Sequence, residues 1–381
     1  MTLLSEIASI QTGPFGSQLH KRDYVANGRP IVTVEHLGER AFTRQNLPLV
    51  SDFDADRLKK YQMKCGDIIF SRVGSVDRCS FAEQDNEGWL FSGRCLRIRP
   101  EKTISPEFLY YYLSSKAIKN FVRNIAVGAT MPSINTSLMG EIPVPDIPLN
   151  KQRSIACIMS SLDHKIQANT KINGYLLELA MTRFESALEA KSKTVKFGDI
   201  VALEDSKRIP LNSRDREARK GPYPYYGATS VMDYVDDYLF DEVRVLLGED
   251  GTVIDSEGKP ILQYVWGKYW VNNHAHILAP SGDYSLEAIY VALRRTAINH
   301  IVTGAVQMKI SQRNLKSLEL EMPSPESLDF LQDLFTVYRC NQDESAKLAS
   351  LRDALLPKLM SGEIDVSKVD LTQLNSHLAE Y

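Results

Sequence analysis

The chain has 381 residues, of which 43% are hydrophobic and 24% are charged, and its formal net charge at pH 7 is −3. The length suggests about two or three domains, and the composition excludes collagen-like, low-complexity and wholly disordered chains. Because no segment is strongly basic, binding to DNA would require the basic residues to gather on one face, or a partner to supply phosphate contacts.

The sequence carries no targeting or membrane signal. No apolar run reaches the roughly 18–20 residues of a membrane-spanning helix, and the N-terminal residues lack the basic start and apolar stretch of a signal peptide. The five cysteines are widely spaced without a CxxC pair, so we expect reduced, mostly buried thiols rather than a disulfide framework or a zinc site. A cytoplasmic protein is expected.

An internal repeat with a period of about 180 residues organises the chain. Four segments of the first half match four segments of the second half in the same order. The pairs are Ser92–Pro100 with Asn272–Pro280, Ser105–Leu113 with Ser285–Leu293, Val127–Met131 with Thr303–Gln307, and Glu141–Pro145 with Glu319–Pro323. The first pair predicts a strand that ends at a proline, and the second predicts a helix with serine as N-cap.

Further strands are predicted within each half. Asp67–Gly74 is typical of a strand that runs into a turn, and Glu242–Gly248 is its counterpart. Thr252–Trp270 then predicts two strands joined by a turn at Ser256–Gly258. Both halves are therefore expected to mix strands and helices.

A long helix is predicted after each half, starting near Asn150 and at Ser324, with Pro325 as the first residue of the second helix. The apolar positions, spaced by three and four residues, are Ile155, Met159, Leu162, Ile166, Ile172, Leu176, Leu179 and Phe184 in the first helix, and Leu331, Leu334, Phe335, Tyr338, Leu348, Leu351, Leu355 and Leu359 in the second. Such narrow seams favour an antiparallel pair in which each helix covers the other. Two unrelated core helices are the alternative.

Polar residues interrupt both predicted seams. They are Asn169 and Asn173 in the first helix, and Gln342 and Ser345 in the second. Polar side chains in such positions fix the register of two helices at some cost in stability.

Catalytic signatures are largely missing. There is no G-x-x-x-x-G-K-[ST], no G-x-G-x-x-G and no G-x-S-x-G, and an amino-methyltransferase's Asn/Asp-Pro-Pro-aromatic segment is absent. Asp255, Glu257 and Lys259 resemble the acidic and basic set of a metal-dependent nuclease, but the glycine among them predicts a hairpin tip rather than a rigid strand. His274 and His276 lack an apparent third metal ligand, and we expect them to be ordinary residues of one strand with alternating faces.

Glycine-containing loops with long polar side chains suit nucleic-acid contacts better, because glycine lets the backbone approach phosphate and polar side chains reach base edges. The candidates for DNA binding are Gly16, Ser17, Gln18, His20, Lys21, Arg22, Arg72, Ser75 and Arg78 in the first half, and Tyr225, Tyr226, Thr229, Ser230, Thr303, Gln307 and Lys309 in the second.

These segments carry a family resemblance that extends over nearly the whole chain. Ala354–Asp365, with the sequence ALLPKLMSGEID, resembles the second conserved region of the DNA-specificity (S) subunits of Type I restriction–modification systems. Ile147–Ala156 resembles the entry to their first conserved helix. Gly13–Ser17, and Tyr225–Thr229 with Asp236–Leu239, resemble recurrent segments of their target-recognition domains.

The resemblance implies an α+β fold with two mixed α/β target-recognition domains in a pseudo-two-fold repeat, separated by a long antiparallel helix pair. The implied parts are residues 1–148 (first recognition domain), 149–192 (first helix), 193–323 (second recognition domain), 324–365 (second helix) and 366–381 (C-terminal tail).

The resemblance also implies a function without an active site, cofactor or metal. Each recognition domain would read one half of a bipartite site on double-stranded DNA, and the helix pair would set the spacer between the halves and dock two methyltransferase (M) subunits. Motor/endonuclease (R) subunits could join, and no membrane is involved. Two alternatives stay open: a nuclease acting through Asp255, Glu257 and Lys259, and a scaffold whose two halves bind proteins.

Overall fold

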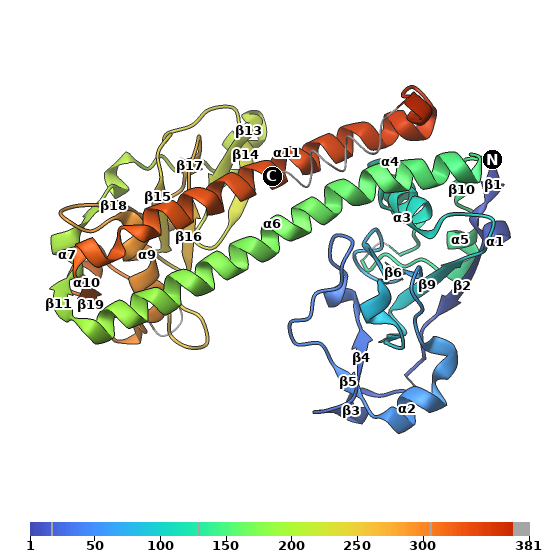
Figure 1. Cartoon of the computed structure of the whole chain (residues 1–381), viewed down its shortest axis with the longest axis horizontal. Helices are drawn as coiled ribbons and strands as arrows, with labels where there is room; N and C mark the ends of the chain where they lie inside the picture. The colour runs from blue at the N-terminus through green and yellow to red at the C-terminus, as the bar shows by residue number, and fades with distance from the viewer. Residues whose placement is uncertain (17, 129, 305–306, 369–381) are drawn as a thin grey trace. The chain divides into compact units, whose positions relative to one another are not determined.

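The computed structural model describes residues 1–16, 18–128, 130–304 and 307–368. The chain folds into two compact units (Figure 1). Unit 1 contains residues 1–168 together with the C-terminal residues from Glu344, and unit 2 contains residues 169–343. Two long helices, α6 (Leu149–Ala190) and α11 (Phe330–Ser361), each contribute residues to both units.

Unit 1 begins with strands and short helical turns and ends in the helices that cover its sheet. Its strands are β1 (Thr2–Leu3), β2 (Ala8–Thr12), β3 (Tyr24–Val25), β4 (Arg29–Val32), β5 (Leu49–Val50), β6 (Ile68–Ser71), β7 (Cys79–Phe81), β8 (Leu90–Phe91), β9 (Cys95–Pro100) and β10 (Pro143–Val144). Its helices are α1 (Leu4–Ile7), α2 (Asp52–Arg57), α3 (Pro106–Ser114), α4 (Lys116–Ile125) and α5 (Thr136–Gly140), with 3-10 turns η1 (Lys21–Asp23), η2 (Val34–His36), η3 (Lys59–Tyr61), η4 (Gln84–Asn86) and η8 (Val366–Lys368).

Unit 2 repeats this order in shorter form. Its strands are β11 (Ser192–Lys196), β12 (Val201–Leu203), β13 (Lys220–Tyr226), β14 (Val231–Val235), β15 (Arg244–Gly248), β16 (Leu262–Val265), β17 (Trp270–Val271), β18 (Ala275–Pro280) and β19 (Glu319–Pro323). Its helices are α7 (Phe197–Ile200), α8 (Ser213–Ala218), α9 (Leu286–Arg295) and α10 (Gln312–Lys316), with 3-10 turns η5 (Asp205–Lys207), η6 (Asn299–Ile301) and η7 (Pro325–Leu328).

The central sheet has the same topology in both units. Unit 1 has the antiparallel order β2-β9-β6-β7, and unit 2 has the antiparallel order β12-β18-β15-β16. The register agrees as well, because Phe70 pairs with Leu96 in unit 1 as Leu247 pairs with His276 in unit 2. The structure therefore confirms the repeat that the sequence predicts.

One helix packs on each central sheet and begins at the predicted serine. Ser105 accepts a hydrogen bond from the Phe108 amide at the start of α3, and Ser285 accepts one from the Ala288 amide at the start of α9. Such a cap satisfies an amide that has no partner within the helix. The buried face of each helix completes the hydrophobic core of its unit.

The predicted strand–turn–strand over Thr252–Trp270 is shorter than expected. Ile254 and Pro260 form a single β-bridge around a turn at Gly258. The regular strands of this segment are β16, which pairs with β15, and β17, which pairs with β13. Pro260 has no amide hydrogen to donate, which limits the pairing of this hairpin.

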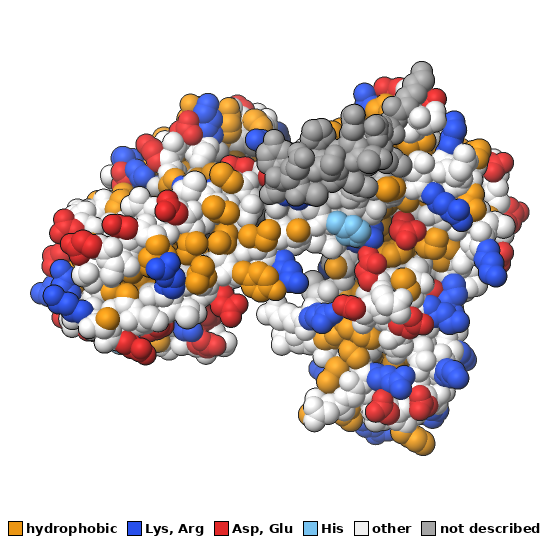
Figure 2. All heavy atoms as spheres, viewed as in Figure 1, with side chains coloured by type: hydrophobic (Ala, Val, Ile, Leu, Met, Phe, Trp, Pro, Cys, Tyr) orange, Lys and Arg blue, Asp and Glu red, His pale blue; other side chains and the backbone are white. Residues whose placement is uncertain are grey.

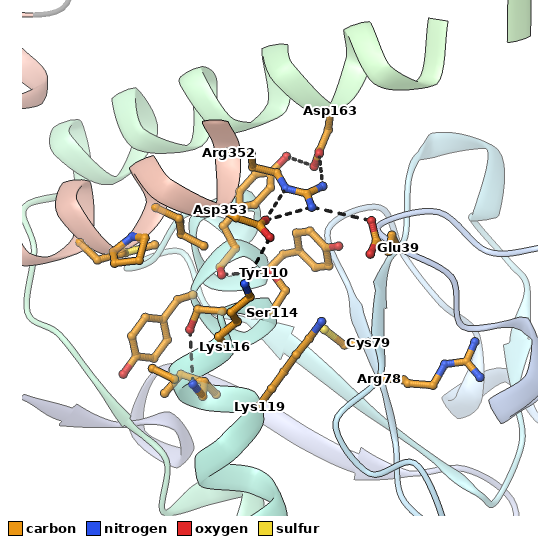
Figure 3. A pocket seen from close by; sticks show the side chains of 18 of the residues that line it. Glu39, Arg78, Cys79, Tyr110, Ser114, Lys116, Lys119, Asp163, Arg352 and Asp353 are labelled. Carbon is orange, nitrogen blue, oxygen red and sulfur yellow. Dashed lines mark hydrogen bonds and ion pairs between the residues drawn. The ribbon is translucent and has the colours of Figure 1, made fainter. Parts of the chain in front are cut away.

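In unit 1, the first part of α6 packs against the last part of α11, and the two helices run antiparallel. Arg352 of α11 donates to Asp163 of α6 at 2.8 Å, and Asp163 also accepts from the Tyr111 hydroxyl of α3 at 2.7 Å (Figure 3). Asp163 is 4% exposed. Because a buried carboxylate is costly unless it is paired and hydrogen-bonded, this contact fixes how the helix pair meets α3.

In unit 2, asparagines form the polar part of the helix seam. Asn173 donates to the Tyr338 carbonyl at 3.0 Å and accepts from the Asn341 amide at 2.8 Å, and Asn169 donates to the Asn341 carbonyl at 3.3 Å. Asn169 and Asn173 are buried. The prediction that polar residues lie in the seam is confirmed for this helix, and each amide finds a partner across the pair.

Some seam positions differ from the prediction. Ile172, Leu179 and Leu351 are exposed by 42%, 43% and 45%, and Gln342 is exposed too, so that Asn341 lies in the seam in its place. A count of apolar residues misplaces the seam here because asparagines occupy its positions. The start of α11 also differs, since Pro325 begins the 3-10 turn η7 and the α-helix starts at Phe330.

No helix among the described residues is both long enough and apolar enough to span a membrane.

Replacement of Asn173 by alanine should lower the free energy of unfolding of unit 2 by about 1–3 kcal/mol, because the Asn341 amide and the Tyr338 carbonyl lose their buried partner. Its exposed neighbour gives the control, and Ile172→Ala should change the free energy by less than about 0.5 kcal/mol. Urea unfolding, followed through Trp266 and Trp270 in a Trp89→Phe background, measures both variants. Equal effects of the two substitutions would contradict the asparagine seam.

Candidate nucleic-acid interface

Each unit carries the same glycine hairpin, spanning residues 127–133 in unit 1 and 303–309 in unit 2, of which the structure describes residues 127, 128 and 130–133, and residues 303, 304 and 307–309. In unit 1, Val127 and Ser133 exchange two backbone hydrogen bonds, of 2.9 and 2.8 Å; in unit 2, Thr303 and Lys309 exchange two, of 2.8 and 2.7 Å. Gly128 and Gly304 have positive φ values of 111° and 90°. A side chain is rarely tolerated in this conformation, which explains why glycine follows the first residue of both hairpins.

The same backbone contacts hold both hairpins. In unit 1, the Gly74 amide donates to the Pro132 carbonyl and the Ile134 amide donates to the Arg72 carbonyl, both at 2.9 Å. In unit 2, the Gly251 amide donates to the Met308 carbonyl at 3.0 Å and the Ile310 amide donates to the Glu249 backbone carbonyl at 2.9 Å. Each hairpin therefore lies against the loop that follows the third strand of its central sheet.

In unit 1, the segment of residues 13–16 completes this surface. The Gly13 amide donates to Cys95 at 3.2 Å, and Arg72 donates to the Gly93 carbonyl at 3.1 Å. The Arg72 guanidinium also lies 5.9 Å from the ring centre of Phe15, which is 56% exposed. An exposed ring beside a guanidinium suits contacts with phosphate, sugar or a base edge.

In unit 2, the loop between β13 and β14 lies beside the central sheet. Gln263 of β16 donates to the Gly227 carbonyl at 2.9 Å, and the Asn272 amide donates to Tyr226 at 3.0 Å. Thr229 and Ser230, at the tip of this loop, are exposed. We call the four loops of unit 2 at residues 227–230, 249–251, 272–274 and 303–309 its loop surface, and those of unit 1 at 13–16, 72–75, 92–94 and 127–133 its loop surface.

The structure brings most predicted residues onto these surfaces, but not all of them. Arg72, Ser75 and Gly16 lie on the loop surface of unit 1, and Thr229, Ser230, Thr303, Gln307 and Lys309 lie exposed on that of unit 2. Exposed His20, Lys21 and Arg22 flank it at η1. Ser17 lies outside the described residues.

Three predicted residues have structural partners of their own. Tyr225 is 1% exposed, and its hydroxyl bonds to the backbone of Leu211, so it belongs to the core and is removed from the contact set. Gln18 accepts from the Tyr61 hydroxyl at 2.8 Å. Arg78 donates to the Leu37 carbonyl and lines a cavity. Tyrosine in an alternating sequence fits a core strand as well as a surface, which is why the pattern misassigned Tyr225.

This cavity of about 750 Å³ belongs to unit 1 and is lined by α3, α4 and α11. Figure 3 shows Lys116 and Lys119 of α4 on one side and the Asp163–Arg352 pair on the other, with Glu39 near Arg352. The cavity thus borders the helix pair.

Charged side chains of both signs are interspersed over the face seen in Figure 2, with apolar side chains between them. On this face, basic residues do not form a continuous field, in keeping with the near-neutral charge of the chain.

Behind the loop surface of unit 2 lies a largely buried ionic cluster, the His276 network, formed by His276, Asp205, Glu249 and Arg208, with exposed Lys309 at its edge. The ring nitrogens of His276 lie 2.6 Å from an Asp205 oxygen and 2.8 Å from the Ile310 carbonyl oxygen. A carbonyl only accepts, so Nε2 carries a proton. Asp205 accepts from the Ile277 amide at 2.9 Å as well, which is typical of an ionised carboxylate, and Nδ1 therefore donates too.

The pKa shifts agree with a protonated His276. Burial alone would lower the pKa of His276, but its bonds with Asp205 and Ile310 outweigh this effect and raise the pKa above the ordinary value. Burial alone would raise the pKa of Asp205, yet the His276 imidazolium holds it below its usual range. The two groups are thus an ion pair inside the unit.

Asp205, Glu249 and His276 place three potential ligand atoms within 4.8 Å of one another, as a metal site would require. Both ring nitrogens of His276 point at acceptors, however, and Arg208 and Lys309 lie 2.7 and 3.3 Å from Glu249. Cationic partners already neutralise these carboxylates, so the cluster is an ionic network. His274 differs from the prediction, because it precedes β18 and lies 2.7 Å from Asp250 in the adjoining loop.

The cysteines are free thiols in two environments. Burial raises the pKa of Cys79 and of Cys95 to about 12, which keeps both protonated and unreactive. Cys65 and Cys340 are exposed, contrary to the expectation that most thiols are buried.

Comparison with known proteins gives the family. The family model described as the Type I restriction modification DNA specificity domain matches the chain twice, over residues 3–177 and 189–349. The chain belongs to this family. It is a non-catalytic specificity subunit, whose function is the recognition of a DNA sequence, while catalysis in such systems lies with partner subunits.

Relatives of this specificity subunit match it along most of its length. The putative type I restriction enzyme MjaX specificity subunit of Methanocaldococcus jannaschii is 23% identical and covers 89% of this chain and 88% of its own length. The MjaIX specificity subunit of the same organism is also 23% identical, over 71% of this chain and 72% of its own. The crystal structure of the Type-I S subunit from M. genitalium shares the fold, with a TM-score of 0.57, 17% identity and 94% of both chains covered.

The nuclease alternative does not fit this specificity subunit. Asp255 accepts hydrogen bonds from the backbone amides of Glu257 and Lys259, at 2.8 and 2.9 Å, and Lys259 pairs with Glu257. Asp255 therefore stabilises the turn, and the three residues form the hairpin tip that the glycine predicts.

Replacement of Gly304 by alanine should destabilise unit 2, because a β-carbon there would lie 2.1 Å from the Gln307 carbonyl oxygen at a φ of +90°. At about 1–3 kcal/mol for such strain and about 2–4 °C per kcal/mol, the unfolding temperature should fall by several degrees. Gly16→Ala, which meets no atom within 4 Å, is the matched control and should leave it unchanged. Calorimetry compares them, and equal unfolding temperatures would refute the constraint on the hairpin.

Proposed function

We propose that this specificity subunit reads a bipartite site on double-stranded DNA, with the loop surface of each unit on one half of the site. The observation that carries the proposal is the pair of glycine hairpins, which sit in the same place on the same sheet and are held by the same backbone contacts. One scaffold used twice on one chain suits a ligand that offers two successive sites of similar shape, as a duplex does at each turn.

The side chains on the two scaffolds differ, which supports two different half-sites. The loop next to the hairpin carries Arg72 in unit 1 and Glu249 in unit 2 at equivalent positions. At the base of the hairpin, Ser133 in unit 1 corresponds to Lys309 in unit 2. Since base edges in the major groove are distinguished by donors and acceptors, surfaces with different donors select different bases.

The proposed contact set contains the predicted residues that lie on the two loop surfaces or beside them in the chain. In unit 1 these are Gly16, Lys21, Arg22, Arg72 and Ser75, with His20 and Gln18 at the border; in unit 2 they are Thr229, Ser230, Thr303, Gln307 and Lys309, with Tyr226 at the border. Phe15, His274 and Asn273 join them from the structure. Ser17 stays a prediction on sequence grounds alone.

Partner subunits complete the proposed function. Two methyltransferase subunits dock on the helix pair and supply the chemistry and additional phosphate contacts, which the near-neutral charge of this chain requires. Motor/endonuclease subunits can join them, and the complex acts on DNA in the cytoplasm. In this proposal α6 and α11 set the spacer between the half-sites.

Exchange of residues 1–148 for the corresponding domain of a relative should change one half of the recognised site and leave the other half and the spacer unchanged. Base discrimination is local, at about 1–3 kcal/mol per bidentate contact, so a domain that does not contact a half-site has little influence on how that half-site is read. Methylation mapping of genomic DNA from cells with either version of the chain reads both half-sites and the spacer together.

The reciprocal exchange of residues 193–323 is the matched control and should change only the other half-site. If either exchange alters both half-sites, the units do not read independently. If methylation is the same with and without the chain, the scaffold alternative gains and the proposal fails.

A further inference from the structure

The His276 network is present in unit 2 and has no counterpart at the equivalent place in unit 1. His276 pairs with Leu247 across the central sheet as Leu96 pairs with Phe70, so Leu96 occupies the equivalent position. Leu96 is fully buried in an apolar core, whereas the His276 side chain, 1% exposed, is surrounded by charged groups. The two hairpins share their backbone contacts, but among the described residues the ionic cluster contacts the hairpin of unit 2.

The network contacts three loops of the loop surface of unit 2, at residues 249–251, 272–274 and 303–309. His276 donates to the carbonyl of Ile310, the residue after the hairpin, and Lys309 at the end of the hairpin lies 3.3 Å from Glu249. Glu249 is the residue whose carbonyl holds the Ile310 amide, at 2.9 Å. Arg208 links Glu249, at 2.7 Å, to the carbonyl of Ala275 at the start of β18, also at 2.7 Å.

The charged groups that face His276 come from every element around it. Asp205 belongs to η5 and Arg208 follows it, Glu249 follows β15, and Lys309 ends the hairpin. Glu249 lies 3.8 Å from the His276 ring and Asp205 lies 2.6 Å from it. With a charged His276 ring, the network holds three cations against two carboxylates. With a neutral ring, the ring keeps one proton for two acceptors, so either Asp205 or the Ile310 carbonyl loses its hydrogen bond from the ring. Asp205 keeps its bonds from the Ile277 amide and the Gln312 side chain, whereas His276 is the side chain that donates to the Ile310 carbonyl.

We propose that His276 is a positioning residue for DNA recognition by unit 2: as an imidazolium it holds the 303–309 hairpin and the 249–251 loop in the geometry that reads one half-site. It does not touch DNA itself, because it is buried beneath the loops. The half-site read by unit 2 therefore depends on the protonation of a single buried group, and the half-site read by unit 1 does not. This proposal rests on the proposed function, although its first test requires no DNA.

The sign of the pH dependence follows from the direction of the pKa shift. The pKa of His276 in the folded chain is raised, while that of an unfolded histidine is about 6.5. The contribution of the imidazolium is therefore complete below about pH 6.5 and is lost as the pH rises through the folded value. Recognition by unit 2 should weaken on the alkaline side, and recognition by unit 1 should not follow it.

Hydrogen exchange on the full chain tests the positioning directly. Between about pH 6 and about pH 9, corrected protection of the amides of Thr303, Lys309 and Ile310 should fall at least about tenfold relative to Val127, Ser133 and Ile134 in the equivalent hairpin. His276→Gln should show this loss already at the lower pH and remove the pH dependence. His300→Gln, which alters an exposed histidine of η6, is the matched control and should behave as the wild type.

Methylation mapping with the assembled complex provides the second arm. His276→Gln should relax base preference in one half-site only, the same half that changes when residues 193–323 are exchanged. Equal protection of the two hairpins at every pH in the wild type would overturn the proposal, even if the variant failed to fold. Relaxation of both half-sites would overturn it as well. A wild-type map without a bipartite site would instead refute the proposed function, while the hydrogen-exchange result would still decide whether His276 positions the hairpin.

Discussion

The rest of this structure depends on one constraint: the long amphipathic helices α6 and α11 are stable only when their apolar faces are packed against other residues. Isolated helices in water gain little from propensity alone, and most of their stability comes from packing of an apolar face. In unit 1, Ile155, Met159 and Leu359 join the hydrophobic core beneath α3. In unit 2, Phe184 and Phe335 do the same beneath α9. Each unit therefore completes its own hydrophobic core with segments of both helices.

Within each unit, the helix seam combines apolar core residues with a few buried polar contacts. Buried asparagines contribute less to stability than apolar residues would, but an amide that must find its partner admits one register. Asn169, Asn173 and Asn341 satisfy one another and the facing backbone in unit 2, and Asp163 with Arg352 plays the comparable part in unit 1. The proposed spacer role requires a fixed register, since a helix pair that slipped by one turn would move about 5.4 Å.

The repeat shows which features a shared scaffold fixes and which it leaves open. Sheet order, strand register, the serine caps and the glycine of each hairpin are common to both units, because they determine the backbone. The groups around the hairpin differ in charge and even in kind, with Leu96 at one position and His276 at its equivalent. Because the shared features hold the backbone, the side chains around the hairpin can differ without a change of fold. One fold is therefore suitable for reading different sequences.

Local signals in the sequence predicted much of this fold. The caps at Ser105 and Ser285, the repeat and the two long helices follow from spacing and residue type over a few neighbouring positions. The contacts that define the candidate site do not, because they join residues far apart in the chain, such as Asp205 with His276 or Phe15 with Arg72. Tyr225 shows the same limit, since its side chain could have faced either side of a strand until the partner Leu211 was known.

The central claim is that the helix pair sets the spacer and the loop surfaces set the bases, and a change of helix length tests it most directly. Insertion of four residues into α6 and four into α11 near the asparagines adds about one turn to each, or about 5.4 Å. Methylation mapping with this chain should return both half-sites unchanged and a spacer longer by about one or two base pairs, at 3.4 Å each. An unchanged spacer, or altered bases at a constant spacer, would contradict the account.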